Sequence, residues 1–136
     1  MLAPFECLCG NFILPEPASY VFFYAFSNLR NLLYIIPASR PVIAAKRDNM
    51  DEYDTIFVGF PIWWYIAPTI INTFLESYNL KGKTVITFAT SGGSGMGKTN
   101  EKLTPSCPGA KLLHGKVFNS YSSKADLSAW VETISL

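Results

Sequence analysis

The chain has 136 residues, of which 49% are hydrophobic, 15% are aromatic and 15% are charged, and its formal net charge is +1. This length suits one domain over residues 1–136, and the apolar content excludes a wholly disordered chain. A charge so close to neutral gives no general attraction to nucleic acid or to an anionic membrane, so we expect neither as a partner. The charges are unevenly placed, because residues 1–38 hold only Glu6, Glu16 and Arg30.

Residues that bind metals or form disulfides are scarce. The three cysteines and the single histidine are Cys7, Cys9, Cys107 and His114. They do not have the spacing of a metal site, so we expect no metal, ordinary thiols and a bland packing or surface role for the histidine. We expect a cytoplasmic protein, since thiols persist there and the first residues do not resemble a signal peptide. The uncharged run 17–29 is too short to span a bilayer.

From Asp54 onward, strand and helix patterns alternate. A continuous apolar run at 55–60, preceded by three acidic residues that we expect to be solvated, predicts a strand buried on both faces. Pro68 suits the first turn of a helix whose apolar residues recur every three to four positions, and Lys81-Gly82-Lys83 is predicted to close that helix. A second buried strand is predicted at 84–89.

The rest of the chain continues the alternation. A glycine-rich loop at 90–97 precedes a short predicted helix at 98–103. A third candidate strand at 112–118 is interrupted by Gly115, and Ser123 is predicted to cap a last helix. Alternating strands and helices predict a parallel sheet with right-handed crossovers. Ligands of such open sheets bind beyond the carboxyl ends of the strands, where two unusual loops lie.

The first loop, at 61–68, contains the consecutive aromatic residues Trp63, Trp64 and Tyr65. Three large rings are costly to leave in water, and a flat aromatic ligand stacked on them would explain their presence. The alternative is that the rings pack on neighbouring helices or on a second subunit.

The second loop matches a phosphate-binding pattern in form, through Gly92, Gly97, Lys98 and Thr99. No later strand ends in an aspartate that would bind magnesium, and Pro105 cuts the following helix short. We therefore expect the loop to present its backbone amides to a neutral or weakly anionic ring and not to a triphosphate.

Taken together, these segments resemble the flavodoxin family, most closely its short bacterial members. Residues 51–64 resemble the third strand and the flavin loop, 67–75 the helix that follows, and 88–95 the fourth strand with its flavin-edge loop. The resemblance covers roughly residues 37–136. Two motifs in the right order, separated by one helix, are more specific than either motif alone.

The resemblance implies a flavodoxin-like three-layer α/β/α sandwich with a parallel sheet in the order 2-1-3-4-5. It also implies noncovalently bound FMN, with no catalytic side chain. The first loop would line the isoalloxazine ring, with one tryptophan stacked on it, and the second would meet its pyrimidine edge through backbone groups. The implied cofactor-binding residues are Pro61, Ile62, Trp63, Trp64, Thr90, Ser91, Gly92, Gly93 and Ser94.

Residues 1–36 depart from the family pattern. The first strand and the Thr/Ser/Gly-rich phosphate loop are not evident, and the nearest strand candidate is 20–26, followed by Ser27 and Arg30 as candidate phosphate contacts. Either this segment replaces the missing strand, or another chain covers the apolar edge at 55–60, or the domain is incomplete. We hypothesise that residues 1–36 arose by truncation, rearrangement or a change of reading frame.

Three functions remain open at this stage. The first is an FMN-binding electron-transfer protein that works with redox partner proteins. The second is a truncated or rearranged non-binding remnant or interaction module, which could form homodimers through its exposed aromatics or a sheet edge. The third is an NAD(P)H-dependent flavin reductase, which the near-neutral charge leaves open because family members that act as carriers are often acidic.

Overall fold

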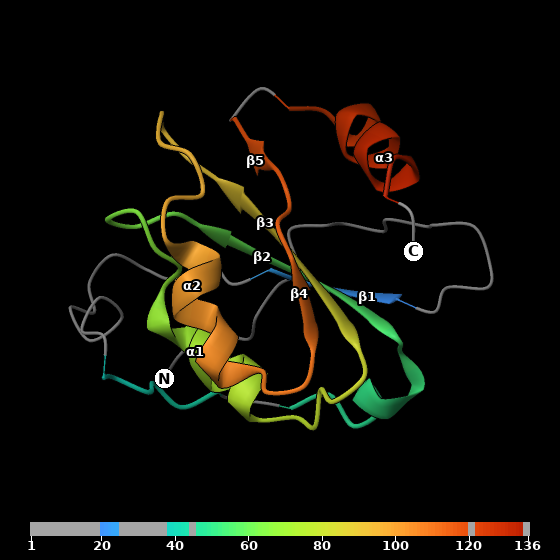
Figure 1. Cartoon of the computed structure of the whole chain (residues 1–136). Coiled ribbons are helices and arrows are strands. Elements are labelled where there is room, and N and C mark those ends of the chain that lie inside the picture. Colours follow the sequence, from blue (N-terminus) through green and yellow to red (C-terminus); the bar gives the residue numbers. More distant parts are fainter. Residues whose placement is uncertain (1–19, 25–37, 44–45, 120–121, 135–136) are drawn as a thin grey trace.

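The structure is a computed structural model that describes residues 20–24, 38–43, 46–119 and 122–134 (Figure 1). Its strands are β1 (Tyr20–Tyr24), β2 (Thr55–Pro61), β3 (Thr84–Thr90), β4 (Lys111–Leu113) and β5 (Val117–Phe118). Its helices are α1 (Thr69–Glu76), α2 (Thr99–Leu103) and α3 (Lys124–Glu132), with 3-10 turns η2 (Met50–Glu52) and η3 (Thr104–Ser106). Among the described residues, no helix has the length and apolar character needed to cross a membrane.

All strand pairs are parallel, which confirms the predicted α/β class. The strand order is β1-β2-β3-β4, and β5 also pairs with β3. This order corresponds to strands 1-3-4-5 of the expected arrangement, and no counterpart of strand 2 is found within the described ranges. The predicted strand at 112–118 is present as two pieces, β4 and β5. Between them the chain at Gly115 passes so close to β3 that a Cβ atom there would overlap the carbonyl oxygen of Thr87.

The strand β1 decides between the alternatives left open for the edge of β2. It pairs with β2 from Tyr20 opposite Thr55 to Tyr24 opposite Gly59. Residues 20–24 of the segment predicted at 20–26 therefore replace the missing first strand, and they cover an edge of β2 that would otherwise expose unpaired backbone groups.

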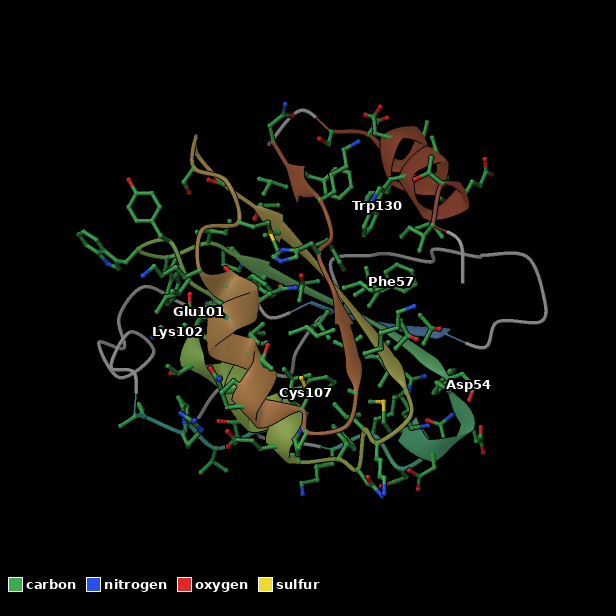
Figure 2. All side chains as sticks on the ribbon, viewed as in Figure 1. Asp54, Phe57, Glu101, Lys102, Cys107 and Trp130 are labelled. Carbon is green, nitrogen blue, oxygen red and sulfur yellow. The ribbon has the colours of Figure 1, made fainter. Side chains whose placement is uncertain are left out.

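Helices lie on both faces of the sheet, as the three-layer prediction requires (Figure 1). On one face, α1 and α2 pack over a large core, whose fully buried members include Ile56, Val58, Ile71 and Leu103. On the other face, α3 packs over a smaller aromatic cluster. Figure 2 shows Phe57 of β2 beneath Trp130 of α3, with ring centroids 5.8 Å apart in an edge-on arrangement.

The sequence predicted the start of α3 correctly but not the end of α1. Ser123 caps α3 as expected: its Oγ accepts the Asp126 N–H at 3.2 Å, and the Asp126 carboxylate accepts the Ser123 N–H at 2.7 Å. The prediction that Lys81-Gly82-Lys83 closes α1 was wrong, because α1 ends at Glu76. There the Ser77 hydroxyl donates to the carbonyl of Thr73 at 2.6 Å, and the backbone leaves the helix.

Candidate functional site

The carboxyl ends of β2 and β3 lie side by side and bring the two predicted loops together. Pro61 is the register partner of Thr90, and the Ile62 N–H donates to the Thr90 carbonyl oxygen at 2.9 Å. On the far side of β3, the Ser91 N–H donates to the carbonyl of Phe118 at 3.3 Å. Both loops therefore start from fixed points on the same edge of the sheet, which is where open parallel sheets bind their ligands.

The first loop forms a tight turn over Trp63–Ile66, which we call the aromatic turn. Trp63 and Ile66 exchange two backbone hydrogen bonds of 3.0 Å each, and the two residues between them have positive φ angles, 51° for Trp64 and 65° for Tyr65. Turns of this kind favour Asn-Gly at the two central positions. The left-handed conformation costs other residues roughly 1–2 kcal/mol each, so this turn holds two bulky side chains in a strained backbone.

The residues predicted to line the flavin ring fall into a half-buried pair and an exposed pair. Ile62 and Trp63 are half-buried and pack against the core beneath α1. In contrast, Trp64 is 79% exposed and Tyr65 is 66% exposed. The packing alternative therefore holds for Trp63, whereas Trp64 and Tyr65 present their rings to solvent. Of the two tryptophans, Trp64 is the more exposed.

The glycine-rich loop, Ser91–Gly97, is organised by the side chain of its first residue. The Ser91 Oγ accepts the N–H groups of Gly93 at 3.2 Å and Ser94 at 2.8 Å, and it lies 2.8 Å from the Ser94 hydroxyl. These two amides therefore already have an acceptor within the loop. The N–H groups of Gly92 and Gly95 make no hydrogen bond within the described part of the chain, and a Cβ at either glycine would meet open space.

The end of the glycine-rich loop contacts the aromatic turn directly. The Lys98 N–H donates to the carbonyl oxygen of Tyr65 at 3.1 Å. Gly97 has a φ of 54°, and a Cβ atom built on it would lie 2.5 Å from the same oxygen. Sequence reasoning missed this contact. The only signal for it was the glycine at position 97, which the pattern of a phosphate-binding loop had already explained in another way.

Residues 33–134 match the family model described as flavodoxin. The chain belongs to the flavodoxin family. Two crystal structures are similar to it, each with a TM-score of 0.65: a "putative flavoprotein" from Bacteroides eggerthii DSM 20697, 42% identical, and another from Bacteroides uniformis ATCC 8492, 43% identical. They cover 74% and 72% of this chain, which spans 63% and 62% of theirs. None of the curated proteins matches it.

The structure also shows that the loop with the phosphate-binding pattern is not built to bind a nucleoside triphosphate. In a nucleotide-binding loop the hydroxyl after the lysine faces a magnesium ion. Here Thr99 is fully buried in α2, at 0% exposure, whereas Lys98 beside it is exposed. The residues therefore do not fit a triphosphate and its metal. Within the described residues no cluster of side chains could hold a metal ion.

The residues at this edge fit the ring part of a flavin. Three features offer a stacking surface and donors for the polar edge of a flat ring: an exposed indole, glycines that border open space, and two amides that bond to no other residue the structure describes. The candidates for the phosphate, Ser27 and Arg30, lie outside the described residues, as does most of the atypical segment 1–36.

The ionisable groups with shifted pKa values lie away from the two loops. The Arg40 guanidinium, 2.8 Å from the Glu76 carboxylate on α1, lowers the pKa of that carboxyl, and the Ser106 hydroxyl adds to the effect. The pKa of Asp126 is lowered by its hydrogen bonds from Ser123 in the α3 cap. Burial raises the pKa of the Cys107 thiol. His114 is exposed between β4 and β5, in agreement with a surface role.

Proposed function

We propose that this protein binds FMN at the carboxyl ends of β2 and β3 and works in electron transfer. The observation that carries the proposal is that the loop at 61–68 and the glycine-rich loop lie side by side at the carboxyl ends of β2 and β3. The backbone of Ile62 is tied to Thr90, which brings the exposed Trp64 and the open glycine-rich loop to the same edge of the sheet. Family membership and two similar crystal structures of putative flavoproteins support a flavin as the ligand.

Each part of the site would have a separate role in holding the flavin ring. Pro61 and Ile62 would form its inner wall, and Trp64 would stack on one face and exclude water from it. Gly92 and Gly95 would donate their N–H groups to the polar edge, while Ser91 keeps the loop in shape through its own hydrogen bonds.

FMN, when bound, supplies a ring that accepts and releases electrons. The chain's own residues favour electron transfer over acid–base catalysis, because segments 61–68 and 90–98 contain no Asp, Glu or His. No carboxylate or imidazole is therefore available in these loops to move a proton at neutral pH. A low-dielectric wall on one side of the ring would disfavour added negative charge and so shift the flavin's potentials.

The proposal extends to the partner and the compartment. We propose that redox partner proteins approach at the exposed edge, where Trp64 and Tyr65 face solvent. A second copy of the chain, docked on the same aromatics or on the outer edge of β1, is the alternative occupant. We place the protein in the cytoplasm, where its free and buried Cys107 stays reduced.

Titration of the purified protein with FMN and with riboflavin tests the proposal. Binding of FMN at micromolar concentration should quench flavin fluorescence and shift the visible absorption bands. Weaker binding of riboflavin would show that a phosphate site exists. Absence of quenching by either ligand would refute the proposal and favour a non-binding module. If FMN binds, bleaching of the bound flavin by NADPH without a partner protein would favour a flavin reductase over a carrier.

A further inference from the structure

We propose that Gly97 is a positioning residue: with Lys98 and α2 it forms a clamp that fixes the aromatic turn, and thereby Trp64, for ligand stacking. We call Gly97, Lys98 and the Tyr65 carbonyl the clamp. The consequence for binding rests on the proposed flavin function, whereas the clamp itself is a property of this chain that can be measured without a ligand.

The clamp is a close backbone-to-backbone contact. The Lys98 N–H donates to the Tyr65 carbonyl oxygen at 3.1 Å. For this bond to form, the chain at Gly97 must pass beside Tyr65, and a Cβ at position 97 would lie 2.5 Å from the Tyr65 oxygen and 3.0 Å from its Cβ. Side-chain Cβ atoms do not tolerate such a distance to backbone. Gly97 also adopts a φ of 54°, which glycine takes without steric cost.

The aromatic turn needs an external restraint because its own backbone is strained. Trp64 and Tyr65 both adopt the left-handed conformation, which bulky residues avoid. Their side chains are largely exposed and supply little packing energy to offset the strain. The reciprocal bonds between Trp63 and Ile66 close the turn, and the bond from Lys98 ties it to the opposite loop.

The other end of the clamp is anchored in the centre of the sheet. Helix α2 buries Thr99 and Leu103 at 0% and 1% exposure. Asn100 accepts a hydrogen bond of 2.9 Å from the hydroxyl of Thr87, a fully buried residue in the middle of β3. The Lys98 amide therefore has a fixed position relative to β3. Its hydrogen bond to Tyr65 holds the aromatic turn, which follows β2, in a fixed position as well.

A set of glycine-to-alanine variants tests the clamp. Gly97→Ala should raise the Kd for FMN by about three- to tenfold, the share that aromatic stacking contributes to binding. Gly82→Ala shares the positive φ, 81°, but borders open space at the far end of β3. It should lower the melting temperature without changing the Kd.

A double-mutant cycle with Trp64→Ala tests whether Gly97 acts through the aromatic ring. If it does, Gly97→Ala costs no further affinity once the ring is absent. The reasoning is overturned if Gly97→Ala binds FMN as tightly as Gly82→Ala, or if its full effect persists in the Trp64→Ala background. Gly97→Asn provides a second variant should Gly97→Ala not fold, because asparagine tolerates the left-handed conformation while keeping the Cβ contact.

A ligand-free measurement separates this inference from the proposed function. In two-dimensional NMR spectra, Gly97→Ala should shift the Trp64 indole N–H and the Lys98 amide, and should speed hydrogen exchange of that amide. Gly95→Ala should leave all three unchanged. If these changes occur but the native protein binds no FMN, the clamp stands and the flavin function fails. If the Trp64 and Lys98 signals do not respond to Gly97→Ala, the clamp is refuted whether or not FMN binds.

Discussion

Replacing Trp64 by alanine is the sharpest test of the proposed site, because this exposed side chain contributes little to the fold and the proposal assigns it to the ligand. Trp64 is 79% exposed, so a bound ring system could cover one whole face of the indole. One face is on the order of 100 Å² of apolar surface, equivalent to about 2.5 kcal/mol at 25 cal/mol/Å². With losses from ordering and desolvation, we expect Trp64→Ala to weaken FMN binding by about 1–3 kcal/mol, or about 5- to 150-fold in Kd.

The assay is the quenching of FMN fluorescence during titration with protein, alongside thermal unfolding of the same samples without ligand. Trp64→Ala should melt close to the native protein, since the side chain contributes little to the core. Trp64→Phe should keep most of the affinity because it keeps a ring. Trp63→Ala is the contrasting variant: Trp63 packs on the core, so its loss should lower the free energy of unfolding by about 2 kcal/mol or more. An unchanged Kd in a folded Trp64→Ala protein would refute the stacking argument.

Three further variants test the fold. Gly115→Ala should cost at least about 3 kcal/mol of unfolding free energy in urea titrations, because its Cβ would overlap the carbonyl oxygen of Thr87. Ser123→Ala should cost about 1 kcal/mol through loss of the α3 cap. Arg40→Ala should make the free energy of unfolding depend less on pH in the acid range. The folded pKa of Glu76 lies below its ordinary 4.5, so its contribution is complete above pH 4.5 and is lost as the pH falls further.

Each of these variants has a matched control. Gly92→Ala adds the same methyl group where nothing lies within 4 Å, so its urea midpoint should stay at the native value. Ser128→Ala lies within α3 and removes a hydroxyl without removing the cap, so it should not destabilise the helix. Arg47→Ala removes an equal charge that forms no ion pair with Glu76, and it should preserve the pH dependence. If the unfolding free energy of Arg40→Ala falls with acid in the same way as that of the native protein, the ion pair does not stabilise the fold.

The sequence by itself determined the elements whose causes are local. The apolar runs at 55–60 and 84–89 became the buried strands β2 and β3, because such runs are stable only where both faces are covered. Pro68 marked the start of α1, and Ser123 marked that of α3, because the groups that begin a helix lie within one turn of it. The order of these elements placed both loops at the carboxyl edge, where parallel strands meet.

Only the tertiary structure decided what depends on contacts between distant segments. The sequence could not distinguish Trp63 from Trp64, because their separation into a packed and an exposed ring depends on how the turn sits against the core. It also could not show that the Tyr65 carbonyl needs the Lys98 amide and a glycine beside it. Local patterns determine which backbone conformation a segment prefers, whereas the pairing of β2 with β3 determines which groups of the two loops come into contact. The candidate site of this protein consists of such contacts between distant segments.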